Sequence, residues 1–87
     1  MLEELMGEKV VVDLRSAFVC LGTLLRADEH FIELRNADLH DLRDTETTRE
    51  LYVAESKATG IKRNRRRLVL FSREVVAVAR LDDVVEK

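Results

Sequence analysis

Three segments in the first half of the chain, from Lys9 on, have the apolar patterns of β-strands, and two of them alternate apolar with polar residues. The three segments are KVVVDLR (9–15), FVCLGTLLRAD (18–28), which is apolar on both faces, and HFIELRNADLHDLRD (30–44). The alternation changes parity near Asn36, which predicts a β-bulge. A glycine in the middle of the second segment, Gly22, predicts strong bending or a close backbone approach.

Two other segments have helical spacing. In LEELMGE (2–8), apolar residues share one helical face and Gly7 is placed to end a short N-terminal helix. In residues 45–61, Thr47 and Glu50 have the spacing of a capping box, and Gly60 suits a left-handed C-terminal cap. The apolar face that this spacing predicts consists of Leu51, Ala54, Ala58 and Ile61.

The chain closes with two short apolar strands, Leu68–Phe71 and Val75–Ala79, separated by Ser-Arg-Glu. The last one, VVAVA, is apolar on both faces, which favours a strand that is covered on both sides. The predicted fold is therefore mainly β, with the order helix, three strands, inserted helix, two strands. Residues 1–87 form a single domain, in which residues 45–67 make up the inserted helix and a basic connection.

A chain of 87 residues buries only about 60–65% of the surface that its unfolded form exposes, so a lone core is marginally stable. Disulfides, a metal or association with other chains usually supplement such a core. A single cysteine, Cys20, closes no internal disulfide, and we expect neither a metal nor a cofactor, because no Cys/His cluster has ligand spacing. Association is the expected supplement. The lone thiol, the absence of a signal segment and the absence of a long apolar run predict a cytoplasmic protein without membrane contact.

The charge is nearly balanced but unevenly distributed along the chain. The formal net charge is −2; residues 1–48 carry 11 acidic and 5 basic residues, whereas residues 49–87 carry 6 acidic and 10 basic ones. This asymmetry fits a local anion site, and it equally fits an acidic face of one subunit against a basic face of another.

The order of elements and three sequence segments together resemble the Sm/LSm family. The segments are GEKVVVDL (7–14), GTLLRAD (22–28), which is similar to the family's G-x-L-x-x-x-D element, and SREVVAV (72–78) after LVLF. The resemblance implies a divergent member of bacterial or archaeal type, with a short N-terminal helix, a strongly bent five-stranded antiparallel sheet forming a small open barrel, and a helix inserted between strands 3 and 4.

The resemblance also implies a homo-oligomer, closed as a ring of about six or seven subunits by pairing of the fourth and fifth strands of neighbours. Ring closure would cover apolar strand edges that otherwise favour aggregation. An ordinary buried strand in a monomer is the alternative. The interface residues that we predict are Leu68, Leu70, Val75, Val76 and Val78.

RNA-binding members of the family hold a base between an aromatic or His residue, an Asn, and an Arg-Gly pair. Here Ile32 falls where the Asn would be, and Phe71-Ser72 where Arg-Gly would be. An apolar side chain neither donates nor accepts a hydrogen bond, so the usual pocket is predicted to be absent. His30 and Phe31 remain as candidates for base stacking. The alternatives are a turn histidine and a core phenylalanine.

Residues 62–67, KRNRRR, contain five cations in six positions. We expect them to connect the inserted helix to the fourth strand. As a belt around a ring, Lys62, Arg63, Arg65, Arg66 and Arg67 would bind RNA or another polyanion through its phosphates. Alternatively, they pair with acidic residues such as Asp38, Asp41, Asp44 and Glu46 within or between subunits, or they form a solvated surface.

No catalytic set is recognisable: Cys20 lies in an apolar strand, and His40, between Leu39 and Asp41, is a single imidazole without a plausible metal set. The sequence therefore predicts a protein that is not an enzyme. The function it favours is an Sm-like ring that binds RNA or another polyanion through a basic belt, with an altered base pocket. The alternative is a homo-oligomeric scaffold for a protein partner that has lost RNA binding.

Overall fold

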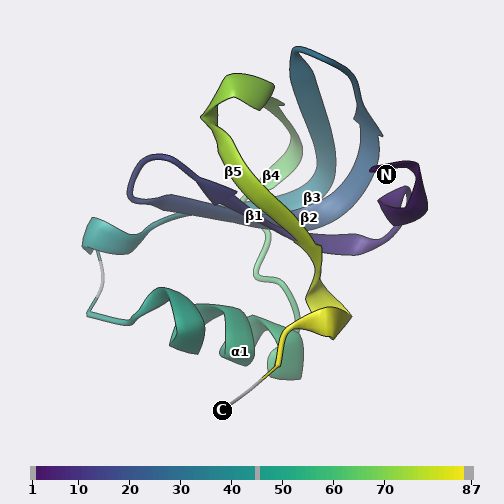
Figure 1. Ribbon diagram of the computed structural model, residues 1–87. Helices are drawn as coiled ribbons and strands as arrows, with labels where there is room; N and C mark the ends of the chain where they lie inside the picture. The colour runs from purple at the N-terminus through teal and green to yellow at the C-terminus, as the bar shows by residue number, and fades with distance from the viewer. Residues whose placement is uncertain (1, 45, 86–87) are drawn as a thin grey trace.

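The computed structural model describes residues 2–44 and 46–85 and shows one strongly bent, five-stranded antiparallel sheet (Figure 1). The strand order is β4-β3-β2-β1-β5. The strands are β1 (Lys9–Leu14), β2 (Phe18–Ala27), β3 (Phe31–Asp41), β4 (Arg65–Phe71) and β5 (Val75–Arg80), and the helix α1 (Arg49–Thr59) is inserted between β3 and β4. The predicted mainly β fold is confirmed.

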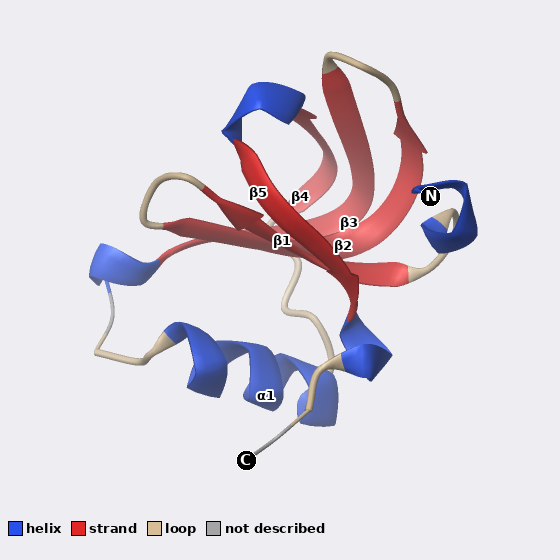
Figure 2. Ribbon diagram, viewed as in Figure 1, coloured by secondary structure: helices blue, strands red, loops and turns tan. Residues whose placement is uncertain are grey.

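Short 3-10 turns complete the architecture, as Figure 2 shows. They span Leu2–Leu5, Leu42–Asp44, Ser72–Glu74 and Leu81–Asp83. The expected N-terminal helix is thus a single 3-10 turn, and Gly7 follows it with a φ of +78°, a conformation that favours glycine. The closing turn leads the chain toward α1, where the described residues end.

The sheet buries apolar residues on both faces, because successive side chains of a strand point to opposite sides. Inside the curve of the sheet, one cluster contains Val10, Val12, Leu24 and Leu34. On the other face, Val11, Val19 and Leu21 of the sheet pack with Val53 of α1 and Leu81. The helix therefore covers the outer face of the sheet, over β1 and β2.

The bend of the sheet coincides with the predicted glycine and bulge. Gly22 is buried, and a Cβ atom built there would lie 3.2 Å from both Cα and Cβ of Ala37. Between β2 and β3 the register shifts at this point, so that Asn36 and Ala37 lie opposite Gly22. Asn36 has a φ of +51°. The bulge expected near Asn36 is confirmed, and its extra residue lets β3 approach the glycine closely.

The N-cap of helix α1 lies one residue later than predicted. The N-cap is Thr48, whose hydroxyl accepts a hydrogen bond from the N–H of Leu51 at 3.2 Å. The predicted capping box of Thr47 and Glu50 is therefore wrong. At the other end, Gly60 donates its N–H to the carbonyl of Ser56 and ends the helix. Its φ of +102° is a conformation that favours glycine, but its backbone lies outside the left-handed helical region that was predicted for this cap.

The predicted apolar face of α1 is only partly correct: Ile61 packs against the outer cluster and Ala54 is half-buried, but Leu51 and Ala58 are exposed. Leu51 is 62% exposed, whereas the buried helix residues are Val53 and Ser56. Tyr52 lies beside them and donates its hydroxyl to the carboxylate of Asp38, which is only 8% exposed, at 2.5 Å. A buried carboxylate needs a donor. The observed orientation of the helix, with Tyr52 and not Leu51 facing the sheet, provides this donor.

We predict that Tyr52→Phe lowers the free energy of unfolding by about 1–3 kcal/mol, because it leaves the buried carboxylate of Asp38 without this donor. Thr59→Val is a matched control, since it removes an exposed helix hydroxyl that donates to Glu55. Chemical denaturation at fixed protein concentration measures both. Equal effects of the two substitutions would contradict a structural role for the Tyr52 hydroxyl.

The last two strands differ from their predicted form. β4 begins at Arg65, so Arg65, Arg66 and Arg67 belong to a strand and not to the connection that was expected to hold the whole basic run. β5 is an edge strand in the single chain, and each of its residues is either half-buried or exposed, which corrects the expectation of a strand covered on both sides.

Candidate nucleic-acid interface

The basic segment is held against the sheet by one asparagine. The side chain of Asn64 forms two 3.1 Å hydrogen bonds with the backbone of Leu39, and its own N–H donates to Ala37. The exposed arginines on both sides of Asn64 are thereby fixed beside β3. Together with Asn36 they surround a hollow of about 410 Å³, lined by Asn36, Arg63, Asn64, Arg65 and Arg66.

The arginines of this hollow differ from their basic neighbours in their partners. Lys62 lies 3.8 Å from Glu55, and Arg67 forms a 2.9 Å ion pair with Glu33. Within residues 2–44 and 46–85, no carboxylate lies within ion-pair distance of the three arginines that line the hollow, Arg63, Arg65 and Arg66. Their charges are therefore available to an external anion.

Two of the acidic residues considered as internal partners of the basic run have other partners. Asp38 accepts the hydroxyl of Tyr52. Asp41 accepts two hydrogen bonds from the guanidinium of Arg43, which lowers the pKa of its carboxyl. Pairing of the basic segment within one chain thus occurs through Glu55 and Glu33, and no ion pair among the described residues joins it to Asp38 or Asp41.

A second exposed cluster lies at the turn between β2 and β3. The rings of Phe31 and Phe71 are 5.6 Å apart, and both side chains are about half exposed, 43% and 50%. His30 meets the edge of Phe31, and the guanidinium of Arg73 lies 4.9 Å from the Phe71 centroid. Aromatic rings that keep an open face offer a stacking surface to a base.

This aromatic cluster is positioned by a rigid turn. One carboxylate oxygen of Asp28 accepts the N–H groups of His30 and Phe31, both at 2.8 Å, and these bonds lower the pKa of Asp28. The N–H of Ser72 donates to the carbonyl of His30. The turn and the end of β4 are therefore tied together. Phe31 is an exposed residue here, not the core phenylalanine considered as an alternative.

Phe71 and Arg73 belong to this cluster but are not among the site residues that the sequence predicts. The strand pairing supplies the missing information, because Phe71 is the direct partner of Phe31 across β3 and β4. Ile32, which falls where RNA-binding Sm proteins would have an asparagine, is 3% exposed and packs in the core. It has no polar group and no access to a ligand.

The predicted RNA-binding residues thus fall into two groups. The arginine hollow lies at the start of β4, and the aromatic cluster lies at its end. Along the extended strand, the distance from Arg65 to Phe71 at the two ends of β4 is roughly 20 Å. His30 and Phe31 therefore do not share one site with Arg63, Arg65 and Arg66 within a single subunit.

The predicted interface residues lie on the two terminal strands of the sheet, β4 and β5. Leu68, Val75 and Val78 are half-buried against the inner core, and Leu70 is buried in it. Val76 is 66% exposed. Each terminal strand has one outer edge that no other strand pairs among the described residues.

The described residues contain no group of three His, Cys, Asp or Glu side chains arranged to hold a metal ion. Burial, followed by the nearby charge of Asp38, raises the pKa of the Cys20 thiol to about 12, so at neutral pH it is not a thiolate nucleophile. None of the described helices has the length and apolar character needed to cross a membrane.

No protein-family model matches the chain, and no curated protein matches it in sequence. Solved structures match its fold. A Pyrococcus abyssii Sm protein in complex with a uridine heptamer superimposes with a TM-score of 0.63 at 17% identity, covering 91% of this chain and 90% of the other. A heptameric archaeal Sm protein gives a TM-score of 0.58, also at 17% identity, covering 91% and 93%. The chain has the Sm-like fold.

Proposed function

We propose that this protein assembles into a ring of its own subunits and binds single-stranded RNA through the arginine hollow. The observation that carries the proposal is the set of three exposed arginines, Arg63, Arg65 and Arg66, without a carboxylate partner among the described residues. Guanidinium groups fit phosphate oxygens bidentately. Repeated in every subunit of a ring, the hollow provides a series of phosphate sites.

Three observations support the assembly and the ligand. Among the described residues, both terminal strands of the sheet have an unpaired outer edge, and exposed strand edges tend to pair with another chain. Of the two structural neighbours, one is heptameric and the other is in complex with a uridine heptamer. The exposed rings of Phe31 and Phe71 add a stacking surface on the same subunit.

The expected binding has little sequence preference. Phosphate contacts position a nucleic acid without reading its bases, and stacking on an aromatic ring tolerates every base. A base-reading polar clamp is missing at Ile32, which is buried. We therefore expect the ring to bind single-stranded RNA without selecting a particular nucleotide.

We expect the affinity for a single-stranded RNA to fall steeply with salt concentration. Replacing Arg63, Arg65 and Arg66 together by alanine should weaken binding and reduce the slope of log K against log salt by about 2 for each subunit that the RNA contacts, since each lost phosphate contact on a single strand removes about 0.7. Fluorescence anisotropy from about 50 to 300 mM salt measures this slope. Arg43→Ala is the control, because Arg43 is paired with Asp41.

The result that contradicts RNA binding is an intact ring that retains no RNA at about 50 mM salt at micromolar protein. That outcome would favour the alternative function, a homo-oligomeric scaffold for a protein partner. The buried Ile32 is the observation consistent with that alternative.

A further inference from the structure

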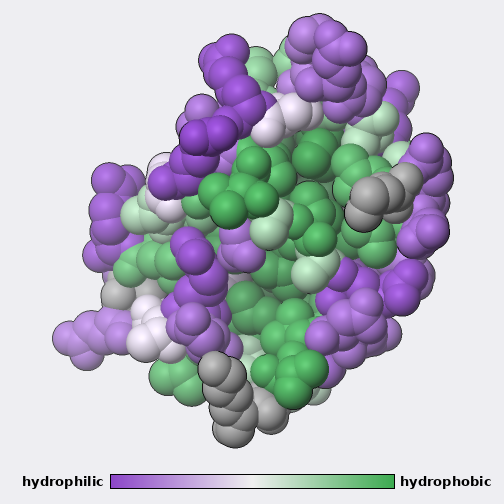
Figure 3. Space-filling model, viewed as in Figure 1, coloured by the Kyte–Doolittle hydropathy of each residue, from purple (hydrophilic) through white to green (hydrophobic). Residues whose placement is uncertain are grey.

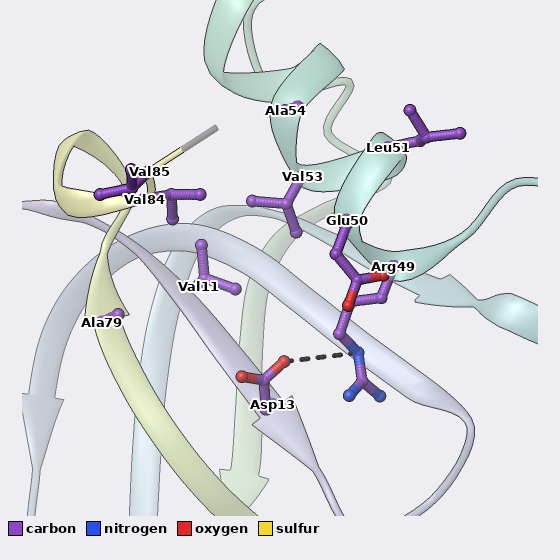
Figure 4. Close-up of a pocket in the computed structure, with 10 residues that line it drawn as sticks. All are labelled: Val11, Asp13, Arg49, Glu50, Leu51, Val53, Ala54, Ala79, Val84 and Val85. Carbon is purple, nitrogen blue, oxygen red and sulfur yellow. Dashed lines mark ion pairs between the residues drawn. The ribbon is translucent and has the colours of Figure 1, made fainter. Parts of the chain in front are cut away.

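A groove of about 470 Å³ separates the helix α1 from the outer face of β1 and β5 (Figure 4). Most of its lining is apolar, and an ion pair of 3.5 Å between Asp13 and Arg49 lies at one end. Leu51 and Val85 at its rim are 62% and 83% exposed. The residues of the groove are Val11, Asp13, Arg49, Glu50, Leu51, Val53, Ala54, Ala79, Val84 and Val85.

The groove lies beside the outer edge of β5, which is unpaired among the described residues. Ala79 of β5 lines the groove, and Val76 of the same strand is 66% exposed. Figure 3 shows apolar side chains gathered on this side of the molecule, over β5 and toward the C-terminal segment, with hydrophilic side chains around them. An apolar groove beside an open strand edge is a place for another β-strand.

The strand at the other side of the same sheet, β4, presents matching side chains. Its partners in β3 show which face each residue occupies: Leu70 lies opposite Ile32 in the inner core, whereas Val69 lies opposite Glu33. Val69 is 54% exposed. Val69 therefore faces the outer side of the sheet, the side that α1 covers elsewhere.

We propose that Val69 of a neighbouring copy occupies the groove between α1 and β5, so that the inserted helix forms part of the contact between subunits. The inference rests on the proposed ring and names a contact within it. A β4 edge that continues the neighbour's sheet beyond β5 keeps Leu70 beside Val78, so that residues of the two inner cores stay on the same side. The same alternation turns Val69 toward Ala79 and the groove.

Charge favours an antiparallel orientation of the two strands. Arg67, which also pairs with Glu33 of its own chain at 2.9 Å, precedes Val69 by two residues on the same face, and Asp82 and Asp83 lie in the turn Leu81–Asp83 that follows β5. An antiparallel arrangement brings the start of β4 to the end of β5, and thus Arg67 to these acidic residues. A parallel arrangement would bring Arg67 to Arg73 and Glu74, whose charges cancel. Arg67 does not line the arginine hollow, so the proposed RNA contact and this contact use different residues.

The test is the protein concentration at which rings form, measured by sedimentation velocity and native mass spectrometry. We expect Val69→Lys and Ala54→Glu each to raise that concentration at least about tenfold, because each places an unpaired charge in the apolar groove. The double variant, Val69→Lys with Ala54→Glu, should restore assembly, since the new ammonium of one copy meets the new carboxylate of the next. Ala58→Glu is the matched control: Ala58 is exposed on the same helix and does not line the groove.

The outcomes separate this inference from the proposed function. Rings of the wild type that persist unchanged in Val69→Lys would overturn the inference and leave the ring in place. Single variants that weaken assembly without rescue in the double variant would overturn the direct contact between Val69 and α1. A wild type that stays monomeric at high concentration would overturn the ring itself. Circular dichroism confirms that each variant is folded before it is scored.

Discussion

Leu24→Ala is expected to lower the free energy of unfolding by about 2–5 kcal/mol, a large part of the stability of a domain of this size. Leu24 is fully buried between the strands of the inner core. Truncation removes apolar area and leaves a cavity among the closely packed side chains that β1, β2, β3 and β4 contribute to this cluster. The loss should therefore lie in the upper half of the range.

Leu51→Ala is the matched control, because it makes the same chemical change on a side chain that is 62% exposed. We expect it to change stability by no more than about 0.5 kcal/mol in the single chain. Urea denaturation followed by circular dichroism compares the two at one protein concentration, since assembly would itself contribute to apparent stability. Similar losses for both variants would contradict the described position of the helix.

Gly22→Val is expected to destabilise the fold by about 3 kcal/mol, with Gly22→Ala between it and the wild type. A Cβ atom at this position lies 3.2 Å from the backbone Cα of Ala37 and 3.3 Å from the carbonyl oxygen of Arg35. These neighbours belong to the bulged strand and have little freedom to move. Valine adds two methyl groups to the same space.

The thermal midpoints of the three proteins test this order. The close approach of β3 to Gly22 accounts for the bend, so Gly22→Val should also weaken assembly, because both edges of the sheet depend on its curvature. A valine variant as stable as the wild type would show that the two strands do not approach as described. A stable variant that fails to assemble would separate curvature from stability.

The predicted strands agree closely with the described ones because their signal is local. In a half-buried sheet, alternation of side chains reports directly on which residues face the core, and Gly22 and Asn36 mark its interruptions. The helix was harder to predict. Leu51, Ala54 and Ala58 have helical spacing, but the face that packs is chosen by Tyr52, Val53 and Ser56.

The choice of that face depends on a residue in another element. Asp38 lies in β3 and is buried, so its carboxylate needs a donor, and Tyr52 supplies it in the observed orientation of the helix. Hydrophobic spacing within the helix contains no information about this need. The amino acids concerned were visible in sequence, but the pairing of Asp38 with Tyr52 was not.

The candidate site shows the same division. The chain itself determined the cationic run, the apolar residue Ile32 in the third strand, and the two apolar strands at the end. Only the tertiary structure decided that Arg63, Arg65 and Arg66 surround one hollow while Arg67 pairs with Glu33. It also decided that Phe31 contacts Phe71 at the other end of β4, about 20 Å along the strand from this hollow. Alternation and composition depend on neighbours along the chain, whereas partners of charges and rings depend on which strands lie side by side.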